Sequence, residues 1–243
     1  MENFQEFDQP TGPEKSSSGI ISHAFDTYKG VFLYALVAMV IYFLVSMIIQ
    51  PITGFDSMEM SEEMRSADGD FSAMDFGSIP GLQLYYGLSG LVGILLAPLF
   101  VGVIYLANQY SFKQKLDFAD LFIGYKQNFV NIIVYGLISS IITTFAFVLC
   151  VLPGFFVLPF FLIGYPIVLF ENASFSEAMS KSFNIAKDNY GVFLGASFLG
   201  ILISIAGVFL CGIGIVATAP FYLIVMYSTY CAFCGRPRPL NIK

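Results

Sequence analysis

Residues 31–49 read VFLYALVAMVIYFLVSMII, a run without a single Asp, Glu, Lys, Arg or His. A helix needs about 20 apolar residues to cross the hydrocarbon core of a bilayer, which is about 30 Å thick. Within that core every backbone amide and carbonyl must find a partner inside the protein, and a helix provides it within one segment. The run therefore predicts a transmembrane helix.

Five further segments share this character. Hydrophobic residues make up 57% of the 243 residues and charged residues 12%, whereas roughly a quarter of the residues in a soluble domain are charged. The six uncharged segments are 31–49, 84–107, 130–152, 154–170, 190–210 and 213–233. We expect an all-α membrane protein with about six transmembrane helices, which form a single domain at 20–235.

The connections between the spans are of two kinds. Short turns at Val151–Gly154 and Cys211–Gly212 predict tight hairpins between the third and fourth spans and between the fifth and sixth. A polar loop at 51–83 instead separates the first span from the second. Its charged residues are Asp56, Glu59, Glu62, Glu63, Asp68, Asp70, Asp75 and Arg65. This acidic loop either binds cations or is solvated, and we favour the second interpretation.

Basic residues predict the orientation, because Lys and Arg accumulate on the cytoplasmic side of short loops. Alternating spans place ten of the eleven basic residues on one side and leave only Arg65 on the other. We therefore expect the acidic loop to be external and both termini to be cytoplasmic. The polar segment 1–19, with Pro10 and Pro13, is expected to be a disordered cytoplasmic tail, and 236–243 a second cytoplasmic tail.

A spacing of 61 residues recurs along the chain. Pro98, Pro159 and Pro220 are separated by it, and Lys126–Phe129 (KQNF) returns as Lys187–Tyr190 (KDNY). Such self-similarity at a fixed period indicates repeated structural units.

A third copy of the motif begins at Lys29–Phe32 (KGVF), where the acidic loop accounts for the longer distance to the proline. We predict three units at about 20–110, 111–171 and 172–232. Each would consist of an interfacial amphipathic helix followed by a two-helix hairpin. The copies would be related by an axis along the membrane normal, because an even number of spans preserves orientation.

Each amphipathic stretch places apolar residues on one helical face. The three faces comprise Ile20, Ile21, Ala24, Phe25 and Tyr28; Leu116, Ala119, Phe122 and Tyr125; and Phe175, Ala178, Met179, Ser182, Phe183 and Ala186. Ser174 with Glu177 predicts a capping box at the start of the third stretch, and Asp117 with Asp120 imitates one in the second. We expect Lys29, Lys126 and Lys187 to lie at the lipid headgroups.

The three prolines fall inside predicted spans, where proline removes a backbone hydrogen bond and tends to kink the helix. They are either hinges at a substrate site or static kinks, and we favour kinks. Ion-coupled transporters and proton pumps generally carry charged side chains within the membrane, and the six spans have none.

Polar side chains in the third span leave a second alternative open. These residues are Asn131, Ser139, Ser140, Thr143 and Thr144. They either line an uncharged pathway or bond to their own or a neighbouring helix, and we favour the bonding role.

The inventory of reactive residues predicts no enzyme. His23 is the only histidine and is expected at the headgroups. Cys231 and Cys234 have the spacing of half a zinc site, but no second Cys or His pair completes four ligands. The common nucleotide, zinc-protease and serine-hydrolase motifs do not occur. We expect no catalytic, cofactor-binding or metal-binding residues, and no nucleic-acid partner.

Residues 169–183, LFENASFSEAMSKSF, followed by the KDNY motif, are similar to a widespread group of bacterial membrane proteins. These resemble the membrane domain that precedes some bacterial glycerophosphodiester phosphodiesterases. The resemblance covers about residues 85–233 and implies the bacterial inner membrane as the location. The phosphodiesterase domain itself has no counterpart, so its activity does not carry over.

Two functions fit these observations. The first is a non-enzymatic inner-membrane protein that interacts with lipids or acts as a scaffolding or assembly factor. Its partners would be membrane lipids and, in a scaffold, other membrane proteins or further copies of this chain. The alternative is a transporter or channel for a neutral or lipid-like solute.

Overall fold

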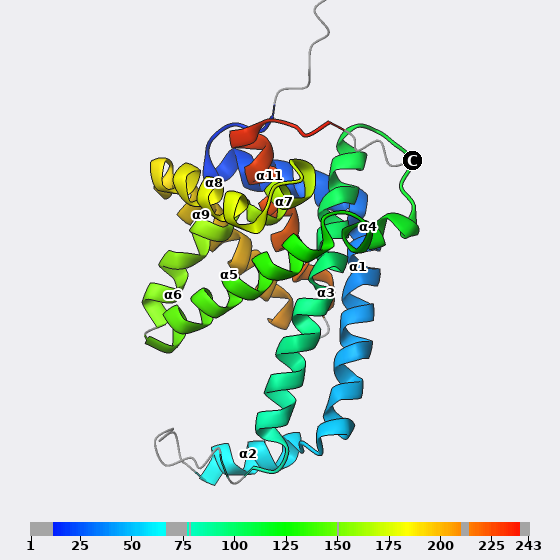
Figure 1. The fold of residues 1–243 in the computed structure, drawn as a ribbon, viewed down its shortest axis with the longest axis vertical. Helices are drawn as coiled ribbons and strands as arrows, with labels where there is room; N and C mark the ends of the chain where they lie inside the picture. The colour runs from blue at the N-terminus through cyan, green and yellow to red at the C-terminus, as the bar shows by residue number, and fades with distance from the viewer. Residues whose placement is uncertain (1–11, 67–76, 78, 150, 210–213, 239–243) are drawn as a thin grey trace, which may run out of the picture. The chain divides into compact units, whose positions relative to one another are not determined.

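The computed structural model describes residues 12–66, 77, 79–149, 151–209 and 214–238. These residues form helices joined by short connections, and no strand occurs among them (Figure 1). Within the described ranges, six helices are long and apolar enough to cross a membrane: Ser17–Thr53, Leu82–Ser111, Phe129–Leu149, Leu152–Phe170, Tyr190–Phe209 and Ile215–Cys234. The predicted all-α membrane fold with six spanning helices is confirmed.

Three of the spans are single helices and three are segmented. The single helices are α1 (Ser17–Thr53), α3 (Leu82–Ser111) and α5 (Phe129–Leu149). The fourth span consists of α6 (Val151–Val157), the 3₁₀ helix η3 (Leu158–Phe161) and α7 (Gly164–Phe170). The fifth consists of α9 (Tyr190–Ile205) and the 3₁₀ helix η4 (Ala206–Phe209). The sixth consists of α10 (Ile215–Thr218) and α11 (Phe221–Cys234).

Contacts divide the chain into two compact units. The larger unit comprises Met1–Ala38 and Ala97–Lys243, and the smaller unit comprises Met39–Leu96. Both boundaries lie inside continuous helices, α1 and α3.

The smaller unit contains the part of the predicted acidic loop that the structure describes. A short helix, α2 (Ser57–Ser66), occupies it, and no residue of α2 is buried. Gly81, which precedes α3, has a φ of +72°, and a Cβ atom at this position would collide with the carbonyl oxygen of Thr53. Glycine is therefore required for this connection. Residues 67–76 and 78 of the loop lie outside the described residues.

In the larger unit, the first amphipathic stretch is not a separate helix. It forms the opening turns of α1, which continues into the span without a break. Ile20, Ala24, Thr27, Val31 and Ala35 are buried at spacings of three or four residues, so one stripe runs through both parts. The predicted interfacial helix and the predicted span are therefore one helix.

The second amphipathic stretch is shorter and more tightly wound than predicted. It consists of a 3₁₀ helix, η2 (Phe118–Phe122), and a single α turn, α4 (Ile123–Lys126). Leu121 and Ile123 are buried, whereas Phe122 of the predicted apolar face is 45% exposed. A 3₁₀ helix has 3.0 residues per turn, so the α-helical period assigns the wrong residues to the buried face.

The third stretch forms α8 (Phe175–Asp188), as predicted. Ala178, Ser182 and Ala186 are its buried residues. They belong to the predicted face and share one side of the helix at i, i+4 and i+8.

Both predicted helix starts carry caps. The capping box of Ser174 and Glu177 is present at the start of α8 and is confirmed. In the second stretch, the Asp117 carboxylate accepts a hydrogen bond from the Ala119 amide at 3.0 Å and caps η2 rather than an α-helix.

The three prolines of the predicted repeat have different local structures. Pro98 lies inside the continuous helix α3, Pro159 lies in η3, and Pro220 is the N-cap of α11. The spans α5 and α9 begin at Phe129 and Tyr190, at the predicted spacing, whereas the first copy of the motif lies within α1. The three-unit repeat therefore stays a prediction.

The hairpin between the third and fourth spans differs from the prediction. The turn was expected at Val151–Gly154, but α6 begins at Val151 and includes Pro153. Proline fits there because the first-turn amides of a helix have no intrahelical partner. Phe147 and Phe155 lie on the two arms with ring centroids 5.3 Å apart, so the arms are adjacent. Residue 150 lies outside the described residues.

The hairpin between the fifth and sixth spans is also supported on both sides of its turn. The Thr218 hydroxyl of α10 donates to the carbonyl oxygen of Ser204 in α9 at 2.6 Å. The predicted turn at Cys211–Gly212 lies outside the described residues, as does Cys150.

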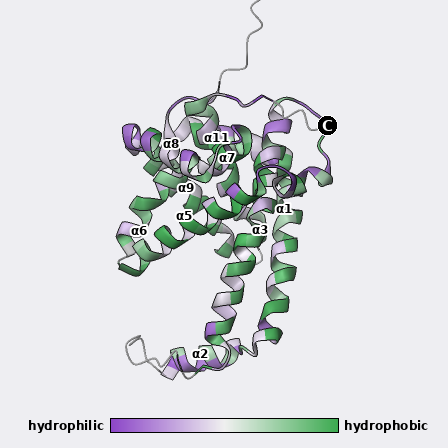
Figure 2. Ribbon diagram, in the orientation of Figure 1, coloured by the Kyte–Doolittle hydropathy of each residue, from purple (hydrophilic) through white to green (hydrophobic). Residues whose placement is uncertain are grey.

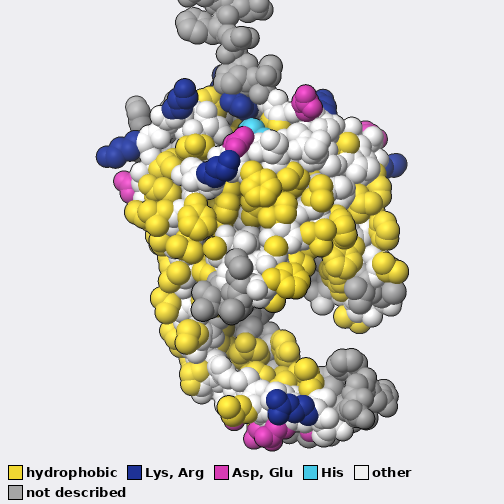
Figure 3. Space-filling model, turned by 180° about the vertical axis from the view of Figure 1, so that it is seen from behind, with side chains coloured by type: hydrophobic (Ala, Val, Ile, Leu, Met, Phe, Trp, Pro, Cys, Tyr) yellow, Lys and Arg dark blue, Asp and Glu magenta, His cyan; other side chains and the backbone are white. Residues whose placement is uncertain are grey.

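The surface of the larger unit separates charge from apolar area. Hydrophobic residues predominate in α5, α6 and α9 (Figure 2). Charged side chains gather at one end of this unit, beside a broad hydrophobic surface (Figure 3). Lys29, Lys126 and Lys187 are all exposed. This separation is typical of a protein whose apolar surface faces lipid.

Candidate functional site

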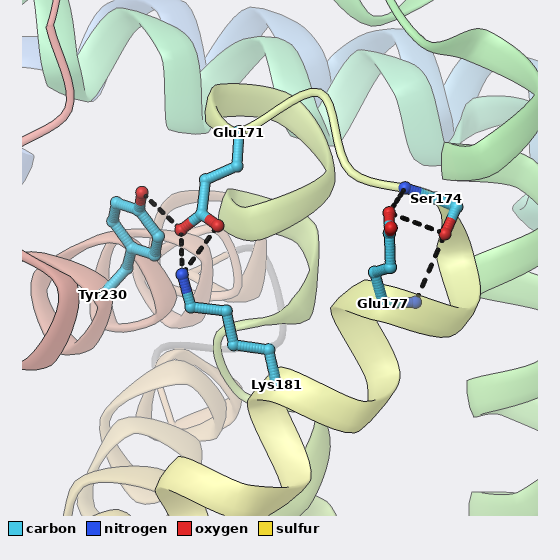
Figure 4. A network of polar contacts seen from close by, with 5 residues as sticks. All are labelled: Glu171, Ser174, Glu177, Lys181 and Tyr230. Carbon is cyan, nitrogen blue, oxygen red and sulfur yellow. Dashed lines mark hydrogen bonds and ion pairs between the residues drawn. The ribbon is translucent and has the colours of Figure 1, made fainter.

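A polar cluster fixes α8 to two spans in the larger unit (Figure 4). Glu171, directly after α7, forms an ion pair with Lys181 of α8, with Nζ–Oε distances of 2.6 and 2.7 Å. The Tyr230 hydroxyl of α11 donates to the same carboxylate at 3.0 Å. Sequence patterns did not indicate this cluster, because its members are too far apart in sequence for any helical spacing to pair them.

The start of α8 is fixed independently. The Ser174 amide donates to the Glu177 carboxylate at 2.9 Å, and the Glu177 amide donates back to the Ser174 hydroxyl at 3.3 Å. The hydrogen bond from the Ser174 amide lowers the pKa of Glu177, since it favours the charged carboxylate.

Two asparagines at the start of α5 also bind the segment that leads into α8. The Asn128 side-chain amide donates to the carbonyl oxygens of Val168 and Ala173 at 2.9 and 2.8 Å. The Asn131 carboxamide oxygen accepts from the Phe175 amide at 3.1 Å. Asn131 was considered for a polar pathway, and the structure uses it to hold α8.

The helix break at Pro159 is stabilised by hydroxyl groups. Proline and the 3₁₀ turn leave nearby carbonyl oxygens without their usual helical partners. Three hydroxyls bond such carbonyls: Tyr190 to Phe156, Ser182 to Phe160 and Tyr135 to Phe161, at 3.0, 2.7 and 2.9 Å. These bonds favour the static-kink interpretation of Pro159 over a hinge.

A largely apolar groove lies between α8 and the α5–α6 hairpin. We call it the α8 groove; its volume is about 500 Å³. Its lining residues are Ile142, Val157, Phe160, Phe161, Met179, Ser180 and Phe183. The rings of Phe160 and Phe183 stack with centroids 4.8 Å apart. The contacts described above fix α8, which forms one wall of the groove.

A second cavity, of about 300 Å³, contains the predicted hydroxyl residues. We call it the hydroxyl cavity; its lining includes Ser139, Ser140, Thr143, Thr144, Tyr135, Tyr165 and Tyr222. The hydroxyls of Ser139, Ser140 and Thr143 donate to backbone carbonyls three or four residues earlier in α5. This is the predicted bonding role, although the same side chains also face a cavity.

A third cavity, of about 530 Å³, lies where α1, α3 and the segment after α11 meet in the larger unit. We call it the polar pocket; its lining residues are His23, Asp26, Thr27, Gly30, Tyr110, Ser111, Lys113, Gln114, Leu116 and Arg236. His23 Nδ1 lies 2.9 Å from the Ser228 hydroxyl. At Gly30 a Cβ atom would collide with the Tyr110 ring, so glycine allows this ring to approach α1.

Behind the polar pocket lies a buried hydrogen-bond network. The Tyr227 hydroxyl is 3.1 Å from both Asn108 Oδ1 and Ser111 Oγ. Among the described residues, Asn108 Nδ2, Gln109 Oε1 and Arg236 Nε are buried without a hydrogen-bond partner. His23 was expected at the headgroups, and no sequence pattern relates it to Lys113 and Arg236, since three separate segments supply these residues.

Cys231 is buried and Cys234 is partly buried, and both are free thiols. Within the described ranges, no group of three or more His, Cys, Asp or Glu side chains could hold a metal ion.

Comparison with known proteins adds no relative. The chain matches no family model, no curated protein and no solved structure. The resemblance to the membrane domain of glycerophosphodiester phosphodiesterases therefore stays a prediction, and the function has to be inferred from the cavities and their chemistry.

Proposed function

We propose that this integral membrane protein is non-enzymatic and acts by binding membrane lipids, with an acyl chain held in the α8 groove. The observation that carries the proposal is an apolar groove beneath an amphipathic helix that the protein fixes in place. Six of its seven lining residues are apolar, and a lipid chain is the apolar ligand that a membrane supplies at high concentration.

The attachment of α8 supports this function. Its apolar side faces the groove, and Lys181 and Lys187 on the same helix are exposed. Amphipathic helices of this kind lie in the membrane interface, with basic residues near anionic headgroups. A preformed groove binds more tightly than one that must be ordered first, because the ordering cost is avoided.

The distribution of Lys and Arg supports an orientation with both termini in the cytoplasm, and the bacterial inner membrane is the location that the resemblance implies. In this arrangement α8 lies at the cytoplasmic interface. Lipid binding there is compatible with a scaffolding or assembly role, in which other membrane proteins or further copies of the chain are the partners.

Filling the groove tests the proposal. Ile142→Trp places a large side chain in the groove, and Ile141→Trp is the matched control, because Ile141 is 59% exposed and does not line the groove. The measurement is native mass spectrometry of protein released from bilayers of defined phospholipid composition. We expect Ile142→Trp to retain fewer phospholipids than the wild type and Ile141→Trp to retain the wild-type number. Equal retention by the two variants would refute the proposal.

The hydroxyl cavity favours a second candidate function, transport of a neutral solute. Its lining combines serine, threonine and tyrosine hydroxyls without a charged side chain, which is the chemistry that an uncharged polar solute requires. Flux of glycerol into proteoliposomes, abolished by Ser139→Leu but not by Ile141→Trp, would establish this function. Absence of protein-dependent flux of neutral solutes would leave lipid binding as the activity.

A further inference from the structure

We propose that the polar pocket binds a phosphate-bearing anion, with Arg236 and Lys113 as its charged contacts. The pocket shares no residue with the α8 groove, so this inference goes beyond the proposed function and does not depend on it.

Arg236 provides the strongest argument. Its Nε atom is buried and has no hydrogen-bond partner among the described residues, and its side chain lines the pocket. A buried donor without an acceptor is costly, and a cationic donor more so. A ligand oxygen that bonds the part of the guanidinium lining the pocket would offset this cost by partnering the same cation. Guanidinium groups bind phosphate and carboxylate through paired N–H donors.

Lys113 adds a second positive charge in an unusual backbone conformation. Its φ is +53°, a value that glycine usually adopts at the end of a helix. The Gln114 amide donates to the Gln109 carbonyl at 3.0 Å, which closes α3 in the way that such a terminal residue allows. A lysine held in a conformation that favours glycine indicates that its side chain has a role.

The negative charges near the pocket repel an anion only weakly. Asp26 is the one carboxylate in the lining, and it pairs with Lys29 at 3.0 Å on a well-exposed surface. The last carbonyls of α3 carry partial negative charge, and Lys113 lies next to them. Arg236 has no ion-pair partner among the residues that the structure describes.

The number of donors favours phosphate over carboxylate. Tyr110, Thr27 and Gln114 line the pocket together with the two cations, and their side chains carry hydroxyl or amide donors. A carboxylate offers two oxygens, whereas a phosphate monoester offers three terminal oxygens that accept strong hydrogen bonds. The ligand is either the headgroup of a phospholipid or a soluble phosphate ester, since both present this chemistry.

Matched pairs of ligands test the proposal and separate the two sources. Thermal unfolding of the full chain in detergent would be measured with phosphatidic acid against diacylglycerol, and with glycerol 3-phosphate against glycerol. Ligands that bind the native state raise the unfolding temperature. We expect stabilisation only by a phosphate-bearing member. Stabilisation by phosphatidic acid alone would identify a lipid headgroup, and stabilisation by both phosphate compounds would identify a soluble ester.

Two arginines provide the variant and its control. Arg236→Gln is expected to raise the half-saturating concentration about tenfold, as loss of one charge-assisted contact would. Arg238→Gln removes the same charge from an exposed residue outside the pocket and is expected to bind like the wild type. Equal responses of the two variants, or no stabilisation by either phosphate compound, would overturn the proposal.

Lys113→Gly is a second variant that tests the pocket if Arg236→Gln does not fold. Glycine suits the positive φ, so the unfolding temperature without ligand should not fall, while the response to phosphate should weaken. Wild-type binding by Lys113→Gly would exclude Lys113 as a contact. Ile142→Trp, which fills the α8 groove, should leave the phosphate response intact, so failure of either proposal is distinguishable from failure of the other.

Discussion

The opening turns of α1 and the helix α8 have similar amphipathic patterns but different structures. Both bury one stripe of small or apolar side chains in the larger unit. The stripe of α1 continues into a span as one helix, whereas α8 is a separate helix with its own caps. The difference shows that apolar periodicity determines which face is buried, and that the residues at the ends determine where a helix stops.

The third residue of the repeated motif, after KG, KQ or KD, distinguishes the continuous helix from the interrupted ones. In the repeated motif, Val31 corresponds to Asn128 and Asn189. Val31 lies within α1, while Asn128 has a φ of +50° between α4 and α5, and Asn189 ends α8 and precedes α9. Asparagine tolerates positive φ and bonds nearby backbone groups, whereas a β-branched valine does neither. At this position of the motif, the helix continues through Val31, whereas a helix ends before Asn128 and before Asn189.

Asn128→Val is expected to lower the stability of the protein more than any other substitution considered. Valine at positive φ costs about 1–2 kcal/mol, and the carbonyls of Val168 and Ala173 lose their partner, so the free energy of unfolding should fall by about 3 kcal/mol in total. Asn128→Gly keeps the backbone conformation and loses only the hydrogen bonds. Denaturant titration in micelles should rank wild type above Asn128→Gly and Asn128→Gly above Asn128→Val. Equal stability of the two variants would exclude backbone strain as a cause.

Glu171→Ala tests how firmly α8 is attached. The substitution leaves Lys181 without its ion pair and the Tyr230 hydroxyl without its acceptor, and we expect a loss of about 1–2 kcal/mol, reduced by solvent screening of the partly exposed pair. Amide hydrogen exchange should become faster in α8 than in α9. Glu171→Gln keeps an acceptor for Tyr230 and should have a smaller effect. Unchanged exchange in α8 would show that the cluster does not hold this helix.

Ser174→Ala removes the N-cap that makes α8 a separate helix. Loss of such a cap costs about 1 kcal/mol. Ser176→Ala, two residues further into the helix at an exposed position, is the control and should have little effect. Thermal unfolding of the two variants in the same detergent provides the measurement, and equal unfolding temperatures would contradict a capping role.

The smallest expected effect is a pH dependence of the capping box. The pKa of Glu177 is lowered in the folded protein by the hydrogen bond from the Ser174 amide. The ionised carboxylate therefore stabilises the fold above its unfolded pKa, near 4.5, and this contribution disappears as pH falls through the lower folded value. Stability measured from pH 6 downwards should decrease less in Glu177→Gln than in the wild type. Parallel curves would contradict the lowered pKa.

The six spans and the capping box could be predicted from the sequence, because both depend on local composition and spacing. The turn predicted at Val151–Gly154 was wrong, because these residues belong to α6 and uncharged residues do not mark where a hairpin bends. A break in α1 was wrongly predicted near Lys29–Phe32, because the lysine of the motif was given more weight than Val31, which allows the helix to continue.

Sequence patterns could not predict the cavities. The α8 groove depends on how α8 packs against the α5–α6 hairpin, and the polar pocket combines side chains from three segments. Ser182 was predicted on the buried face of α8, but its bond to the Phe160 carbonyl depends on the backbone break at Pro159. Tertiary packing decides such contacts.

The most direct test of the proposed function locates the bound lipid. A phospholipid with a photoactivatable acyl chain would be incorporated into bilayers with the wild-type chain, irradiated, and the labelled peptides mapped by mass spectrometry. The α8 groove predicts labelling concentrated on Ile142, Met179 and Phe183, and loss of this labelling in Ile142→Trp but not in Ile141→Trp. Labelling spread evenly over exposed residues such as Phe209, and equal in both variants, would contradict a specific lipid site.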